Sequence, residues 1–293
     1  MRITTNMQLT DALASQARAS QQVYNLTKQA STGLKINAPS DDPAGYASVV
    51  TANAQISVLQ ARSATIDNAN GDLNLADGAL ASAGDLMIQA KQLAITSADG
   101  SQSTSDRANA AAQISQIAQQ LIGLGNTQGA SGYIFGGTKT DTPPFSANGA
   151  FNGNAGVTQV EVATGVLAQS NASGANAFTA AGGRDVIADL QSLASALSSN
   201  DVSAIQSSIG TMGADGDQLV AARVNAGVAA STLQSSSQII SSALITVQTT
   251  AAGESNADIP TVYSELTQAQ TSYTSALSVN HQILSMFQAN QNI

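Results

Sequence analysis

The sequence predicts a mainly α-helical protein: its N- and C-terminal halves form long antiparallel helices, with a small β-rich domain inserted at the tip. Apolar residues repeat every seven positions in both halves, and short polar or glycine-rich stretches interrupt both halves at mirrored places. The middle of the chain changes to a two-residue alternation. A seven-residue apolar repeat is typical of a helix that packs on another helix. Two such repeats around one insertion indicate a chain that folds back on itself.

Each end of the chain carries a narrow apolar seam with three- and four-residue spacing. A narrow seam buries little surface in isolation, so such helices become stable only against a partner. The ends therefore indicate a protein that assembles. The seam residues that we expect at an assembly interface are Leu9, Leu13, Tyr24, Val262, Leu266, Tyr273, Ile283 and Phe287.

The longest heptad series lie on either side of the middle of the chain and are similar in length. We expect them to pack as an antiparallel rod, with Leu73 near Leu233, the midpoints of the two series. Asp42 and Pro43 read as the N-cap and first residue of the outgoing helix. The residues expected in rod packing are Leu59, Ile66, Leu73, Leu80 and Met87 in the first series, and Leu219, Leu233, Ile240 and Val247 in the second.

The segment between the two series has a different character. Thr158, Val160, Val162 and Thr164 alternate with other residues, which predicts a strand, and Asn148-Gly149 predicts a turn. After it we expect one helix from about residue 185, a short helix over 202–209, and then the long return helix. The predicted domains are residues 1–42 with 254–293 as terminal assembly helices, residues 43–128 with 184–253 as the helical rod, and residues 129–183 as the β-rich outer domain.

Charge and composition exclude several classes of protein. The net charge is −9 and the ten Lys and Arg are scattered, which argues against a nucleic-acid partner. No apolar run approaches the roughly 18 residues of a membrane span, so no membrane insertion is expected. The first residues lack the apolar region of a cleaved secretory signal.

No constellation of residues predicts catalysis, so we expect no enzyme and no catalytic, cofactor-binding or metal-binding residue. Residues 132–140 look faintly like a P-loop, but Thr138 stands where that loop needs lysine. His281, the only histidine, has no evident carboxylate partner. Asp41 and Asp42 read as a helix cap rather than a cation site.

Two stretches carry a resemblance to a known family. Residues 31–45, STGLKINAPSDDPAG, resemble the N-terminal motif of bacterial flagellins and their relatives. Residues 133–145, YIFGGTKTDTPPF, resemble the stretch that leads into the outer domain of the hook–filament junction proteins, the hook-associated protein 3 family of the flagellin superfamily. The polar C-terminal end departs from that family and resembles flagellin.

The resemblance implies a structural role in the bacterial flagellum, outside the cell, after export by the flagellar type III apparatus without a cleaved signal peptide. The implied partners are another hook-associated protein on the hook side, flagellin on the filament side, further copies of the chain in a ring, and an export chaperone at the C-terminal region. A flagellin filament subunit is the alternative. A secreted adhesin or type III tip protein, and after it a hydrolase, carry lower weight.

Overall fold

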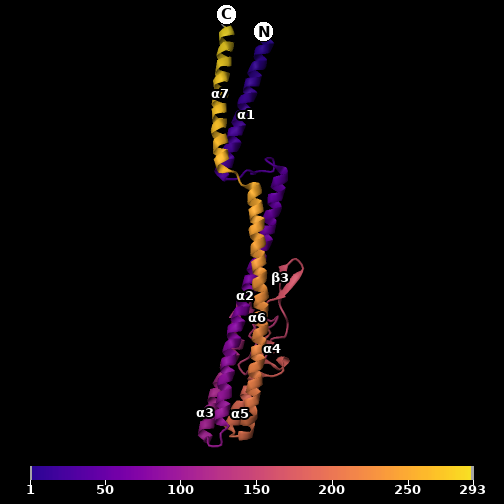
Figure 1. The fold of residues 1–293 in the computed structure, drawn as a ribbon, viewed down its shortest axis with the longest axis vertical. Helices are drawn as coiled ribbons and strands as arrows, with labels where there is room; N and C mark the ends of the chain where they lie inside the picture. Colours follow the sequence, from indigo (N-terminus) through magenta and orange to yellow (C-terminus); the bar gives the residue numbers. More distant parts are fainter. Residues whose placement is uncertain (1, 292–293) are drawn as a thin grey trace. The chain divides into compact units, whose positions relative to one another are not determined.

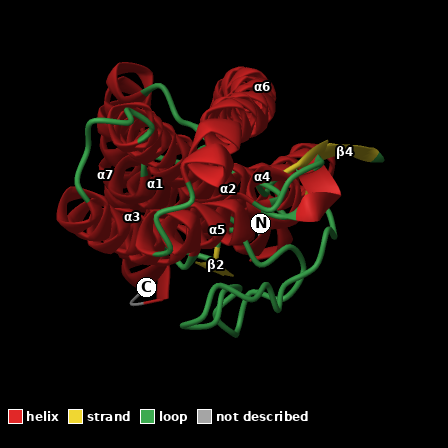
Figure 2. Cartoon of the chain, turned by 90° about the horizontal axis from the view of Figure 1, so that it is seen from below, coloured by secondary structure: helices red, strands yellow, loops and turns green. Residues whose placement is uncertain are grey.

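The computed structural model covers the 293 residues, with the backbone described for residues 2–291 and the side chains for residues 7–286 and 288. Helices dominate, and the strands are short (Figures 1 and 2). The mainly α-helical fold class predicted from the sequence is confirmed. The elements are α1 (Arg2–Thr32), α2 (Pro43–Ser97), α3 (Thr104–Gly125), β1 (Gln128–Gly129), β2 (Gly132–Tyr133), β3 (Gln159–Ala163), β4 (Val166–Gln169), α4 (Gly174–Phe178), η1 (Ala180–Gly182), α5 (Val186–Ser198), α6 (Val202–Ser255) and α7 (Ile259–Gln291).

The chain divides into two compact units, each described here by itself. The terminal unit comprises residues 1–58 and 244–293, and the middle unit comprises residues 59–243. The three-part division expected from the sequence, with its boundaries near residues 42, 128, 183 and 253, stays a prediction.

In the terminal unit, α1 and α7 pack antiparallel, and the two ends of the chain lie at the same end of the pair (Figure 1). Gly33 follows α1 with a positive φ of 71°, a left-handed conformation that favours glycine after a helix. The side chain of Asp42 accepts a hydrogen bond from the N–H of Gly45 at 3.0 Å, so it caps α2 as predicted.

In the middle unit, the heptad on α6 runs further than the sequence indicated. The expected short helix over 202–209 is part of one continuous 54-residue helix. Ile205 and Met212 extend the seven-residue series back from Leu219, and all three side chains are buried. This burial offsets the roughly 1 kcal/mol by which each of Gly210, Gly213 and Gly216 weakens a helix.

The β-rich segment lies in a different place from the one expected. Glu161 on β3 forms an ion pair with Arg62 at 3.0 Å. Arg62 lies on α2, close to the first residue of the middle unit. Figure 1 shows β3 beside the long helices, while α3 and α5 occupy the end where α2 and α6 turn. The tip therefore consists of helical turns. The segment closes on its own aromatic core, where the rings of Phe135 and Phe145 meet Phe178 edge-on at centroid distances of 5.3 and 5.5 Å.

The exposed faces of the long helices carry many short hydroxyl side chains that bond to their own helix. On α6, Thr232, Ser235 and Thr249 donate to the carbonyl oxygens four residues earlier at 2.8–3.0 Å. These hydroxyl groups therefore need no hydrogen-bond partner from another element or another molecule. Within the described residues, no helix is both long and apolar enough to span a membrane.

Candidate assembly site

The seam between α1 and α7 is the first candidate surface. On α7 the buried or half-buried side chains are those expected, including Val262, Leu266, Tyr273 and Ile283. Leu26 of α1 packs against Val262 and Ala269 to form the small core of the pair. The side chain of Phe287, also expected on this seam, lies outside the described residues.

On α1 the expected seam was wrong by one residue. Leu9 lies on the seam as expected, but Leu13 and Tyr24 are exposed, by 52% and 63% of their surface. Large side chains suggested the position, yet Ala12 stands on the seam in place of Leu13, and Val23 in place of Tyr24. The side chains that face α7 are Leu9, Ala12, Gln16, Ala19, Val23, Leu26 and Ala30.

The pair leaves several large apolar side chains exposed. Besides Leu13 and Tyr24 on α1, the exposed large apolar residues of α7 include Tyr263, Val279 and Leu284. Leu13 and Tyr24 are eleven residues, about three helical turns, apart, so they lie on the same side of α1. The assembly role of the predicted terminal residues stays a prediction.

The turn that follows α1 is held tightly to the turn before α7. Lys35 donates its backbone N–H to the carbonyl oxygen of Ser255 at 2.7 Å, and Ala257 donates to the carbonyl oxygen of Gly33 at 2.9 Å. We name this pair of hydrogen bonds the terminal bridge. It fixes the level at which α1 and α7 begin to pair.

The flagellin-like motif of residues 31–45 has a physical explanation in this turn. Asp41 accepts from the N–H groups of Asn37 and Ala38, both at 2.9 Å. A Cβ atom on Gly45 would lie 2.5 Å from the carboxylate of Asp42 and 2.6 Å from the side chain of Ile36, so a larger residue would displace the helix cap. Both aspartates of the motif therefore serve the turn and the helix cap, as expected for Asp42.

The rod in the middle unit is the second candidate surface. Ile66, Leu73, Leu80 and Met87 on α2 are fully buried, and Leu59 is half-buried against them. On α6 the corresponding side chains are Leu219, Leu233 and Ile240, all buried, while Val247, half-buried, belongs to the terminal unit.

Polar contacts between α2 and α6 give the register of the rod. Asp77 pairs with Arg223 at 2.8 Å, and Asp67 lies 3.3 Å from the hydroxyl of Ser237. These two contacts place Leu73 level with residues near 229. Leu233, which was expected opposite Leu73, therefore lies about one helical turn from that level.

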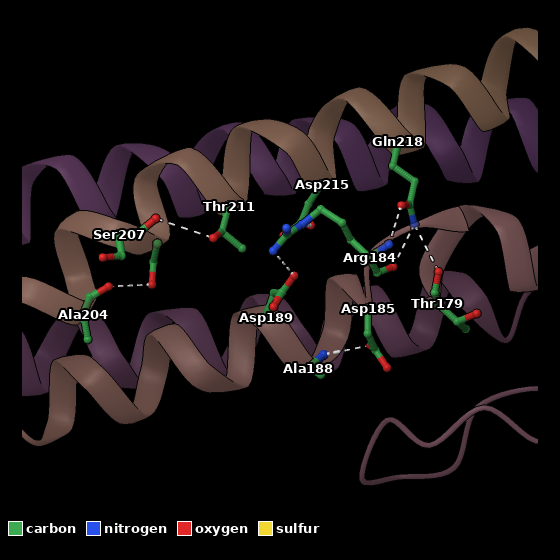
Figure 3. A network of polar contacts seen from close by, with 11 residues as sticks. Thr179, Arg184, Asp185, Ala188, Asp189, Ala204, Ser207, Thr211, Asp215 and Gln218 are labelled. Atoms are coloured by element: carbon green, nitrogen blue, oxygen red, sulfur yellow. Dashed lines mark hydrogen bonds and ion pairs between the residues drawn. The ribbon is translucent and has the colours of Figure 1, made fainter. Parts of the chain in front are cut away.

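A polar network ties the start of α5 to α6 (Figure 3). Arg184 donates to Asp215 and to Asp189, both at 2.6 Å. The amide of Gln218 donates to the carbonyl oxygens of Ala177 and Arg184 at 3.1 and 2.9 Å, and its oxygen accepts from the N–H of Arg184 at 3.0 Å. The side chain of Asp215 is fully buried, and its Oδ2 has no hydrogen-bond partner.

This network predicts an unusual pH dependence. Burial raises the pKa of Asp215 to about 6, against the opposing hydrogen bond from Arg184, and the carboxylate of Asp189 adds to the rise. A carboxyl whose folded pKa is raised stabilises the fold most below its unfolded pKa, and loses this contribution as pH rises through about 6. We expect the free energy of unfolding of the native chain, relative to Asp215→Asn, to rise by about 2 kcal/mol from pH 7.5 to pH 4.5.

Urea denaturation of both proteins at a series of pH values measures this difference. Subtracting the variant removes the contributions of the other carboxylates, which the two proteins share. Two parallel stability curves would contradict a raised pKa at Asp215.

Sequence reasoning missed the network and one further buried charge. Asp215 lies between the expected short helix over 202–209 and the heptad series that begins at Leu219, where a polar residue carries no signal. Arg107 on α3 is also buried, and donates to the carbonyl oxygens of Ser97 and Asp99 at 2.9 and 2.8 Å and to the side chain of Asn200. Only knowledge of the helix ends that meet there would have identified it.

His281 and the P-loop-like stretch lie in ordinary structural surroundings. His281 is exposed on α7. The P-loop-like stretch forms a short strand and turn, in which Gly137 takes a positive φ of 73° beside Asn154. No cluster of three or more metal-binding side chains occurs among the residues that the structure describes.

Comparisons with known proteins agree with this architecture. Residues 3–140 match the family described as the bacterial flagellin N-terminal helical region. A comparison with curated protein sequences finds no match. The first half of the chain thus carries a flagellin-type helical region, as the motif at residues 31–45 indicated.

Several solved structures share the fold. A structure from Vibrio parahaemolyticus assigned to the flagellar hook-associated proteins has 20% identity and a TM-score of 0.67, covering 74% of this chain and 100% of that one. FlgL from Xanthomonas campestris has 19% identity and a TM-score of 0.61, covering 69% and 99%. Hook-associated protein 3 from Legionella pneumophila has 14% identity and a TM-score of 0.60, covering 69% and 97%. The chain has the fold of flagellar hook-associated proteins.

Proposed function

We propose that this chain is a structural subunit of the bacterial flagellum that joins the hook to the flagellin filament. The observation that carries the proposal is the fold: the chain spans nearly the full length of several hook-associated proteins, and its first 140 residues include a flagellin-type helical region. The chain would act outside the cell, with another hook-associated protein on one side and flagellin on the other.

The terminal unit supports an assembling role. Among the described residues of the α1/α7 pair, the fully buried apolar core consists of Leu26, Val262 and Ala269, while Leu13 and Tyr24 remain exposed. Burial of each exposed large side chain in an assembly would contribute about 1.5–3 kcal/mol. The same surface would meet further copies of the chain or the neighbouring flagellar proteins. We also propose, from the family resemblance, that an export chaperone binds the C-terminal region before secretion.

The experiment is genetic and uses the whole chain. Deleting the gene is expected to leave hooks intact, to leave filaments unattached, and to release flagellin into the medium. The native gene should restore attached filaments, whereas Leu13→Ser combined with Tyr24→Ser should not, because the exposed apolar face is lost. Gln22→Ser, an exposed polar change on the same helix, is the matched control and should restore them.

A flagellin filament subunit is the competing function, since the matched helical region is a flagellin feature. Purified chain added to filament fragments separates the two by electron microscopy. A junction subunit adds a thin layer and stops, whereas long filaments made of this chain alone would establish a flagellin. Normal attached filaments in the deletion strain would exclude both roles.

A further inference from the structure

Two polar residues of the α1/α7 seam meet, one from each helix. Among the seam positions whose side chains are described, Gln16 is the only polar residue on α1 and Asn280 is the only polar residue on α7. Asn280 is 4% exposed, and its amide nitrogen donates to the side-chain oxygen of Gln16. Its own oxygen has no hydrogen-bond partner.

This pair is a poor way to gain stability. A half-satisfied buried amide stabilises a helix pair less than a leucine of similar volume would, because the unpaired oxygen is desolvated. An apolar residue at the Asn280 position would bury more apolar surface. The geometry therefore points to a role other than stability.

The apolar side chains of the seam do not by themselves distinguish between registers that differ by seven residues. Apolar seams repeat every seven residues, so a slip of α1 by seven residues again places apolar side chains against apolar side chains. In one slipped pairing Leu9 replaces Gln16 opposite Asn280, and in the other Val23 replaces it. Either slip leaves the buried amide of Asn280 with no partner, and only the observed register joins the two amides.

We infer that the Gln16–Asn280 pair selects the register in which α1 and α7 associate. The terminal bridge at Gly33, Lys35, Ser255 and Ala257 sets the near end of the pair. The amide pair lies about 17 residues along α1 from Gly33, roughly 25 Å at 1.5 Å per residue, and adds discrimination at the far end. This inference concerns the helix pair itself and holds whatever the chain assembles into.

Disulfide trapping in the full chain tests the register, because the sequence contains no cysteine. Gln16 level with Asn280 places Ala19 level with Ala276, so Ala19→Cys with Ala276→Cys reports the observed register. Ala12→Cys with Ala276→Cys reports a slip of seven residues, since the two positions are otherwise about 10 Å out of level. The readout is the rate of each disulfide under mild oxidation, within a chain and between chains.

Two substitutions with opposite effects on stability make the test sharp. Asn280→Leu should raise the melting temperature, and Gln16→Leu should lower it by leaving Asn280 unpaired. Both should increase the rate of the slipped disulfide relative to the observed one by at least about tenfold, because both remove the energetic difference between registers.

The result separates register selection from simple stabilisation. If slipping only followed stability, the two variants would change the ratio of rates in opposite directions, and the inference would be wrong. An unchanged ratio in both variants, or no Ala19–Ala276 disulfide in the parent chain, would also overturn it. A matched exposed change, Gln22→Leu, should leave the ratio at the parent value.

Discussion

Leu73→Asp is expected to lower the free energy of unfolding by about 4 kcal/mol or more, enough to unfold a marginally stable chain. Leu73 is 1% exposed in the core between α2 and α6. The substitution removes an apolar side chain from this core and leaves a carboxyl there with no designated partner, and both effects are large. The reversible unfolding midpoint in urea, followed by helical circular dichroism, measures the loss.

Leu75→Asp is the matched control for this prediction. It makes the same substitution on the same helix two residues away, but Leu75 is 47% exposed. Helix propensity changes equally in both variants, so the difference between them reports burial alone. We expect less than about 1 kcal/mol for Leu75→Asp. Equal losses in the two variants would show that α2 does not pack along the seam of Leu73.

Arg107→Met is expected to cost about 1–3 kcal/mol, although Arg107 forms no ion pair with a carboxylate. Its guanidinium is buried and donates to the carbonyl oxygens of Ser97 and Asp99 and to the side chain of Asn200. Ser97 ends α2, and its carbonyl oxygen has no partner further along the helix. Methionine fills the volume but leaves the carbonyl oxygen of the buried Ser97 unpaired, at about 1–3 kcal/mol, whereas the exposed Asp99 and Asn200 can bond to water.

The control for Arg107 is Arg223→Met, which removes a visible ion pair. Arg223 bonds to Asp77 through two nitrogens at 2.8 and 3.1 Å, but its side chain is 48% exposed. Exposed ion pairs contribute about 0–1 kcal/mol, so this variant should melt close to the parent protein. A larger loss at Arg223 than at Arg107 would mean that the turn at the end of α2 does not depend on the buried guanidinium.

The helices were predictable from the sequence where large side chains mark the packed face. Leu59 to Met87 and Val262 to Ile283 were placed on the correct faces because each series contains bulky residues at regular intervals. The seam of α1 was misplaced because Ala12 and Ala19 form it, while the larger Leu13 and Tyr24 point outward. Side-chain size was a misleading guide on α1, because small residues such as Ala12 and Ala19 contact α7 while larger neighbours point outward.

The remaining differences arise from tertiary contacts that no local pattern records. The short helix expected over 202–209 is joined to the long return helix, because burial of Met212 keeps α6 helical through Gly210, Gly213 and Gly216. The β3–β4 hairpin contacts α2 through Glu161 and Arg62, which are 99 residues apart in the sequence. The buried Arg107 and Asp215 depend in the same way on elements that come together only after folding.

The hydroxyl-rich surface of the long helices has a consequence for the entropy of association. A lysine or glutamate loses up to about 1.5–2 kcal/mol of rotamer freedom when it is immobilised, whereas alanine loses none and short side chains lose little. Only 10% of the residues are charged, and on α6 hydroxyl groups such as those of Thr232 and Ser235 are already fixed to the backbone. A neighbouring molecule that covers this surface therefore immobilises few flexible side chains, so even modest apolar contacts leave a net gain in free energy.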